Sequence, residues 1–246
     1  MAYGYRHVCL CSIICTILLD FRKKGVMSNY TQEIQNLVNA ALAELDQEHR
    51  FGKLVNAPVA NNHYLVRWVA KALKSQRFGR AVVDDLTRWQ KAGRSKGDDA
   101  GLPFIFKRIS AYYAQFFPDG VEQKVLKDSD IESFLDQMEH EGWEVSTSEP
   151  LIKVGKVQIF TEGQNSLALC ADQCDSCFEQ ERLAKPMSWF VRGNHAEFVE
   201  KAAQAGFMVH KVTDYKSQVK YHGEYLVFPE NQGNQLAEIP LSFRAE

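Results

Sequence analysis

The stretch Phe134–Val145, which reads FLDQMEHEGWEV, decides the fold, because its pattern returns at Phe198–Val209 as FVEKAAQAGFMV. Both copies place a phenylalanine eight positions before a glycine, an aromatic residue directly after that glycine and a valine two positions further on. Glycine commonly ends a helix in a left-handed turn, and apolar residues at alternating positions are typical of a strand. Each copy therefore predicts a β-α-β-like unit whose helix returns to a sheet through a glycine.

The residues around the two copies extend this pattern into a small sheet. Ser129 with Glu132 has the spacing of a capping box ahead of the first helix, and Asn194 with Glu197 has it ahead of the second. The remaining strand-like segments are WEVST at 143–147, LIKVGKVQIF at 151–160, SLALCA at 166–171 and YHGEYLVF at 221–228. An internal duplication and the limited chemistry of helix–glycine–strand turns would both produce the resemblance of the copies, and both explanations stay open.

The N-terminal half of the chain predicts helices without strands. Asn62 is expected to cap a second helix, Val82–Trp89 to lie in a third, and Leu102 to begin a fourth that is rich in aromatic residues. A first helix over residues 31–47 is expected from apolar residues at helical spacing: Ile34, Leu37, Val38, Ala41, Leu42 and Leu45.

The expected fold class is therefore α+β. A helical N-terminal domain at residues 28–118 is followed by a small α+β domain at residues 119–246, which holds the two β-α-β-like units. The chain has 246 residues, enough for one large domain or two ordinary ones. With 45% hydrophobic and 24% charged residues, its composition is that of a globular protein that can bury a full core.

Residues 1–27 stand apart from this organisation. Their apolar run, Val8–Leu19, is shorter than the roughly 20 residues that a membrane-spanning helix needs. The basic cluster at residues 22–24 follows this run, whereas a signal peptide carries its positive charge before it. Met27 comes directly before the first amphipathic helix. We therefore expect residues 1–27 to be a non-native extension that results from a mis-assigned start.

Charge is distributed unevenly along the chain, although its formal net value is only −2. Lysine and arginine dominate from Arg67 to Arg108, and acidic residues dominate residues 119–149. The second and third helices form a basic helical hairpin, which could neutralise phosphates of a nucleic acid or meet an acidic protein surface. The candidate contact residues are Arg67, Lys71, Lys74, Arg77, Arg80 and Arg88. Basic residues near helix ends also favour the helix dipole without any ligand, and the acidic segment could itself meet the hairpin, inside the chain or across a dimer.

The cysteines offer a second candidate site. Cys170, Cys174 and Cys177 have the C-x3-C-x2-C spacing with which radical S-adenosylmethionine enzymes hold a four-iron cluster. His195 or His210 could instead complete a zinc site with them. The simpler alternative is that these are small core residues of a strand and a helix start. The other three cysteines, Cys9, Cys11 and Cys15, lie in the expected extension. Because the cysteines form two tight local clusters without a secretory pattern, a reduced, cytoplasmic chain is expected.

Two stretches of the basic hairpin carry a resemblance to a known family. HYLVRWVAKALKSQRF at 63–78 and DDLTRWQKAGRSKG at 84–97 resemble a bacterial family described as domain of unknown function 2913. The resemblance runs from about Ser28 to the C-terminus. It implies a cytoplasmic bacterial protein that is often encoded on mobile elements, and it transfers no catalytic or binding residues. The cysteine triplet is not a motif of that family.

The leading functional hypothesis is a non-enzymatic binding or interaction module whose basic hairpin contacts nucleic acid or an acidic protein surface. The alternative is a metal-binding protein or enzyme built around Cys170, Cys174 and Cys177. No phosphate-binding glycine loop, zinc-protease helix or nucleophile elbow occurs in the sequence. We therefore expect no cofactor and no membrane partner.

Overall fold

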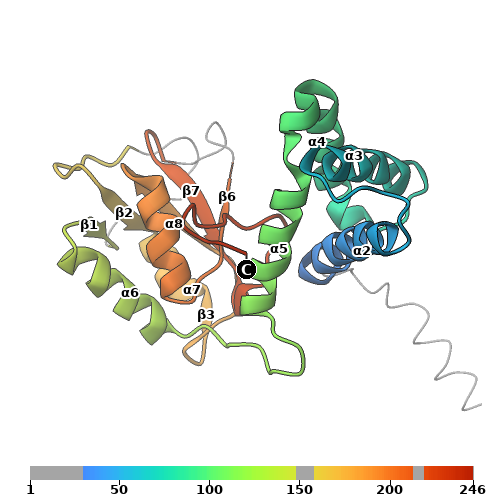
Figure 1. The fold of residues 1–246 in the computed structure, drawn as a ribbon. Helices are drawn as coiled ribbons and strands as arrows, with labels where there is room; N and C mark the ends of the chain where they lie inside the picture. Colours follow the sequence, from blue (N-terminus) through green and yellow to red (C-terminus); the bar gives the residue numbers. More distant parts are fainter. Residues whose placement is uncertain (1–29, 148–157, 213–218, 246) are drawn as a thin grey trace, which may run out of the picture.

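The computed structural model describes residues 30–147, 158–212 and 219–245. The expected extension at 1–27, with its three cysteines, and most of the hairpin expected at 151–160 lie outside these residues. Figure 1 shows two parts side by side, a helical part and a part built on a sheet, with helix α5 at the boundary between them. Helices come first and the strands follow in the C-terminal half, which confirms the α+β class. Within the described ranges, no helix combines the length and the apolarity needed to cross a membrane.

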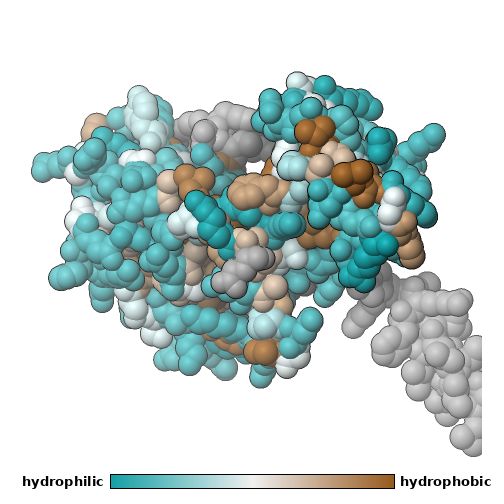
Figure 2. Space-filling view, viewed as in Figure 1, coloured by the Kyte–Doolittle hydropathy of each residue, from teal (hydrophilic) through white to brown (hydrophobic). Residues whose placement is uncertain are grey.

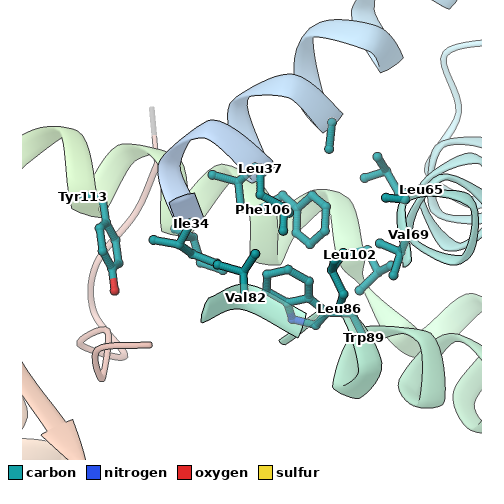
Figure 3. Close-up of a cluster of buried hydrophobic side chains, with 14 of the residues drawn as sticks. Ile34, Leu37, Leu65, Val69, Val82, Leu86, Trp89, Leu102, Phe106 and Tyr113 are labelled. Carbon is teal, nitrogen blue, oxygen red and sulfur yellow. The ribbon is translucent and has the colours of Figure 1, made fainter. Parts of the chain in front are cut away.

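The helical part consists of four long helices and two short 3-10 turns. Their bounds are Tyr30–Arg50 (α2), Pro58–Lys74 (α3), Arg80–Val82 (η1), Val83–Lys96 (α4), Gly97–Ala100 (η2) and Leu102–Phe116 (α5). The apolar stripe expected on the first helix is buried as predicted, with Ile34, Leu37 and Val38 fully enclosed. Figure 3 shows Ile34 and Leu37 in one cluster with Trp89 of α4 and Phe106 of α5, whose rings lie 4.7 Å apart.

The expectation that Asn62 caps the second helix is wrong. Helix α3 already begins at Pro58, whose fixed backbone angle suits the first turn of a helix. Asn62 lies buried inside the helix, where its amide donates to the carbonyl of Gly97 over 2.8 Å and accepts from the N–H of Leu102 over 3.1 Å. Its side chain therefore positions the start of α5 instead of the start of its own helix.

Helices α3 and α4 approach each other closely at a glycine. A Cβ atom added to Gly93 of α4 would lie 2.7 Å from both γ carbons of Val66 on α3. This is closer than carbon atoms pack, so the hairpin of α3 and α4 depends on the missing side chain.

The second part is a five-stranded sheet with the order β1-β2-β5-β7-β6. Strands β1 and β2 pair in parallel and the other neighbours pair antiparallel. The bounds are Glu144–Ser146 (β1), Ser166–Leu169 (β2), Met187–Arg192 (β5), Val209–Lys211 (β6) and Gly223–Val227 (β7). Beside the sheet lie α7 (Ala171–Ser176), the small ribbon of β3 (Phe178–Glu179) and β4 (Arg182–Leu183), and the turn η4 (Pro229–Asn231).

The two copies of the repeated pattern form equivalent structures. Helices α6 (Asp128–His140) and α8 (His195–Gln204) cover the same face of the sheet, as Figure 1 shows. Phe134 of α6 stacks on Trp189 of β5 at 5.2 Å, and Phe198 of α8 packs edge-on against the same ring at 6.2 Å. Gly142 and Gly206 end the helices with φ of +88° and +90°. The helix–glycine–strand prediction is therefore confirmed, while the origin of the repeat stays open. Among the described residues, a strand directly precedes α8 but not α6, so only the second copy forms the expected β-α-β unit.

Neither predicted capping box forms completely, because the N–H of Asn194 donates to Asn165 and not to Glu197. Asn194 caps α8 as expected and accepts from the N–H of Glu197 over 3.1 Å. The box expected at Ser129 and Glu132 is wrong, because α6 begins one residue before Ser129 and the N–H of Lys127 donates to Asp130 instead. Asp128 is held at this point by its N–H bond to the carbonyl of Glu181, a long-range contact that sets where the helix begins.

The two parts are joined by residues 232–245, which we call the C-terminal strap. The N–H of Glu238 donates to the carbonyl of Val209 on the edge strand β6 over 2.8 Å. One residue earlier, the N–H of Ala237 donates to the hydroxyl of Tyr113 on α5 over 3.1 Å. Ala237 is buried in the same apolar cluster as the helices, together with Met208. The strap therefore belongs to the core of the helical part while it extends the sheet edge.

Candidate functional site

Three of the six predicted contact residues share one exposed side of α3. Arg67, Lys71 and Lys74 follow one another at intervals of four and three residues, which aligns them along the helix, and all three are exposed. In the part of the chain that the structure describes, no carboxylate lies within ion-pair distance of them. We call these three residues the α3 basic face. Arg80, at the start of η1, is also exposed.

Arg77 is already held by neighbouring side chains. Its guanidinium lies 2.6 Å from a carboxylate oxygen of Glu44 and 5.2 Å and 5.3 Å from the ring centroids of Trp68 and Phe78. The indole N–H of Trp68 donates to the same carboxylate over 2.7 Å. This arrangement of an ion pair with stacked rings fixes the turn between α3 and η1. A contact of Arg77 with an outside partner stays a prediction.

Arg88 lies on a different surface from the α3 basic face. It pairs with Asp85, one turn earlier on α4, and both residues line a cleft toward the C-terminal strap. The acidic segment is also remote, because Figure 1 shows its helix α6 at the opposite end of the molecule from α3. Among the described residues, α6 therefore does not meet the hairpin inside one chain.

The three cysteines lie close together in sequence but in different environments. Cys170 is buried at the end of β2, Cys174 is half-buried in α7, and Cys177 is buried beyond it, with its thiol donating to the carbonyl of Pro186. Burial raises the pKa of the Cys174 thiol to about 11, and it also raises the pKa of Cys177. Both thiols are therefore protonated at neutral pH, whereas metal ligation and nucleophilic attack require the thiolate.

The histidines proposed to complete a zinc site have other neighbours. His195 Nδ1 lies 3.0 Å from the hydroxyl of Tyr225, and His210 Nδ1 lies 2.8 Å from the carbonyl of Gln235. Among the described residues, no three histidine, cysteine, aspartate or glutamate side chains are grouped so that they could hold a metal ion. The cysteine hypothesis stays a prediction, which metal analysis of purified protein would test.

The structure contains a concave site that the sequence did not indicate. A cleft of about 720 Å³ lies between α4, α5 and the C-terminal strap, and we call it the α4–strap cleft. Its apolar wall includes Trp89, Ile105 and Ile109, with Leu236 and Ile239 opposite. Figure 2 shows apolar side chains at the surface over the helical part and beside the line where it meets the sheet part. Residues more than a hundred positions apart form the two walls, so no local motif could reveal them.

Charged groups converge in this cleft. Asp85 is buried, accepts from the hydroxyl of Tyr30 over 2.7 Å and pairs with Arg88. Burial raises the pKa of Asp85, against the lowering effect of these two partners. Burial also raises the pKa of Glu238 on the strap, while the positive charges of Lys211 and Arg88 lower it. Perturbed carboxylates in a cleft are typical of binding and catalytic sites, although structural ion pairs produce them as well.

Arg108 of α5 supplies a further cation in the cleft. One of its terminal nitrogens donates to the carbonyl of Pro240 in the strap. Its Nε is buried and, among the described residues, has no hydrogen-bond partner. Burial and the nearby Arg244 lower its pKa. Because Nε is covered, a bound oxyanion would contact the remaining part of this half-buried guanidinium.

A serine and a histidine form a polar pair on the sheet face opposite α6 and α8. Ser166 Oγ lies 3.2 Å from His222 Nε2, and His222 Nδ1 lies 2.9 Å from the carbonyl of Lys220. If Nδ1 carries the proton, Nε2 accepts from the serine, as in a nucleophile–base pair. Ser166 is only 1% exposed, however, so a substrate has no path to its hydroxyl and the pair serves to satisfy buried polar groups.

Comparison with known proteins gives one match. The family model described as "Protein of unknown function (DUF2913)" matches residues 29–240. Neither the curated proteins nor the solved structures contain a match to this chain.

Proposed function

The chain belongs to the DUF2913 family, and from this premise we propose that it is a non-enzymatic module that binds nucleic acid through the α3 basic face. The proposal places it in the bacterial cytoplasm, a compartment that suits the free thiols of Cys170, Cys174 and Cys177. It rests on Arg67, Lys71 and Lys74, with Arg80 beside them. Arg77 and Arg88 contribute less, because each already pairs with a carboxylate.

One observation carries the proposal. Three cations stand in a row on an exposed helix side, and no carboxylate of the described chain lies within ion-pair distance of them. The row rises about 10 Å along the helix axis, at about 1.5 Å per residue. Duplex DNA carries one negative charge per about 1.7 Å of its axis, so one such row can neutralise several phosphates. An acidic protein surface could use the same cations, but it would need carboxylates at a matching spacing.

The test measures how salt weakens binding. Fluorescence anisotropy of the full chain is measured with a labelled duplex and with a labelled single strand, at 50 and 200 mM salt. Four neutralised phosphates predict a loss of affinity of about a hundredfold for the duplex over this range. A triple variant, Arg67→Gln, Lys71→Gln and Lys74→Gln, is expected to bind weakly and to lose most of the salt dependence.

A matched control keeps the charge change but moves it elsewhere. Lys107→Gln, Lys127→Gln and Lys185→Gln remove three exposed cations that lie outside α3. Equal weakening in both triple variants would show that net charge alone drives binding, and the proposal would fail. It would also fail if the unaltered chain bound neither nucleic acid at 50 mM salt. Binding of polyglutamate in that case would assign the face to an acidic protein partner.

A further inference from the structure

We propose that the α4–strap cleft binds a small organic anion with an apolar, planar body. The site is separate from the α3 basic face, and the inference is independent of nucleic-acid binding. Its observations are the size of the cleft, the hydrogen bonds that hold the strap beside it, its apolar lining and its excess of cations.

The cleft has the dimensions of a small-molecule site and is formed before any ligand arrives. Its volume of about 720 Å³ lies within the roughly 300–1,000 Å³ that is usual for such sites. One wall is the packed pair of α4 and α5. The other wall is the strap, which two hydrogen bonds hold in place: the N–H of Ala237 donates to the hydroxyl of Tyr113, and the N–H of Glu238 donates to the carbonyl of Val209. Preformed walls reduce the entropy that binding must overcome.

The lining suits a flat apolar group. Trp89 is 3% exposed, and its ring is fixed by Phe106 behind it at 4.7 Å. Ile105 and Ile109 continue this surface along α5, and Leu236 and Ile239 of the strap face it. Trp89 and Ile109 are almost fully buried and form the floor of the cleft. An apolar group in the cleft would cover the half-buried Ile105, Leu236 and Ile239, at about 25 cal/mol for each Å² removed from water.

The charges favour an anion. The lining contains four cations and three carboxylates: Arg88, Lys96, Arg108 and Lys211 against Asp84, Asp85 and Glu238. The buried Asp85 forms an ion pair with Arg88. The positive charges of Lys211 and Arg88 favour the ionised form of Glu238. Arg108 lies on α5 and lines the cleft with a half-buried guanidinium. A carboxylate, sulfonate or phosphate placed at Arg108 would accept a charge-assisted hydrogen bond there.

The test uses two dyes that differ in one group. 1-Anilinonaphthalene-8-sulfonate carries a sulfonate on a flat aromatic body, and N-phenyl-1-naphthylamine is the same body without the charge. Fluorescence titration of the full chain is expected to show one site for the sulfonate dye, and at least tenfold weaker binding of the neutral dye. Neutral-dye binding of equal strength would overturn the preference for an anion.

Two variants locate the site by different means. Ala92→Trp fills the cleft without changing charge, and Arg108→Gln removes the cation, so each is expected to weaken binding of the sulfonate dye at least tenfold. Lys107→Gln, the exposed neighbour on α5, should bind like the unaltered chain. Circular dichroism and melting temperature identify a variant that has unfolded. If one variant is unfolded, dye binding by the other variant tests whether the cleft is the site. Unchanged affinity in a folded Ala92→Trp protein would place the dye elsewhere and refute the cleft.

Discussion

At the residue scale, His210 shows how burial determines the chemistry of a side chain. It is 1% exposed, and its Nδ1 contacts the carbonyl of Gln235 in the strap. The ring meets Phe228 edge-on at 5.1 Å, and the backbone of Gly233 lies so close that a Cβ there would be 2.2 Å from Cε1. Its Nε2 is buried and has no partner among the described residues. Burial consequently lowers the pKa of His210 to about 4, and the neutral ring links the strap to the sheet edge.

Protonation of His210 makes the stability of the protein depend on pH. The pKa of histidine in the unfolded chain is about 6.5, so between about pH 6.5 and 4 the unfolded chain binds a proton that the folded chain excludes. The free energy of unfolding is therefore expected to fall across this range as the pH decreases, by up to about 3 kcal/mol from this residue. Urea unfolding at several pH values measures this slope. His222, whose pKa is also lowered by burial, acts in the same direction.

The contribution of His210 itself is isolated by substitution. His210→Gln should flatten the slope between pH 6.5 and 4, even though the variant is less stable overall. His140→Gln, at an exposed position of α6, serves as the control and should retain the original slope. An unchanged slope in His210→Gln would show that other groups produce the pH dependence.

At the scale of the elements, the spacing of α3 and α4 depends on Gly93. Gly93→Ala introduces a Cβ that overlaps Val66, and overpacking of this kind costs about 1–3 kcal/mol. The better helix propensity of alanine offsets at most about 1 kcal/mol. We expect a lower melting temperature for Gly93→Ala and little change for Ser95→Ala, which alters an exposed position of the same helix.

The same contact predicts how a second substitution behaves. Val66→Ala removes the two γ carbons that the new Cβ would meet, so the double variant should be less destabilised than the sum of the two single variants. Coupling of this kind is expected for residues in direct contact. Strict additivity would show that α3 and α4 do not pack at this point as described.

At the scale of the whole molecule, the strap makes the two parts depend on each other. Ala237 and Met208 lie in the core of the helices, although one belongs to the strap and the other precedes the edge strand β6. The full chain is therefore expected to unfold in a single transition. Far-ultraviolet circular dichroism and tryptophan fluorescence should give the same urea midpoint, as they do for a cooperative unit.

Removal of the strap should uncouple the two parts. A chain that ends at Gly233 loses the backbone bonds from Ala237 and Glu238 and exposes the apolar surface that Leu236 and Ile239 cover. We expect a lower midpoint and separate transitions by the two probes. Two transitions in the full chain would instead mean that residues 28–118 and 119–246 unfold as separate domains. The division of the chain at residue 118 stays a prediction until then.

The sequence by itself determined the features that depend on neighbours a few positions apart. The buried stripe of α2, the Asn194 cap and the left-handed glycines at 142 and 206 all follow from side-chain period or turn chemistry within one element. The exposed row of Arg67, Lys71 and Lys74 follows from helical spacing in the same way. The predicted helix caps were wrong where a distant contact intervened. Asn62 forms hydrogen bonds with residues 97 and 102, and the carbonyl of Glu181 fixes the helix start next to Ser129.

Only the tertiary structure decided the order of the strands, the pairing of Arg77 with Glu44, and the α4–strap cleft. Arg77 lies 33 positions from Glu44, and the walls of the cleft come from α4, α5 and residues 234–239. Side-chain pairing and cavity formation depend on which distant surfaces meet when the core is buried. The hydrophobic effect selects the arrangement that leaves the least apolar area of the whole chain exposed. The residue pattern within one helix or strand does not indicate which distant surfaces meet. The residues of the cleft could therefore be identified only from the structure, in which the strap packs between β6 and α5.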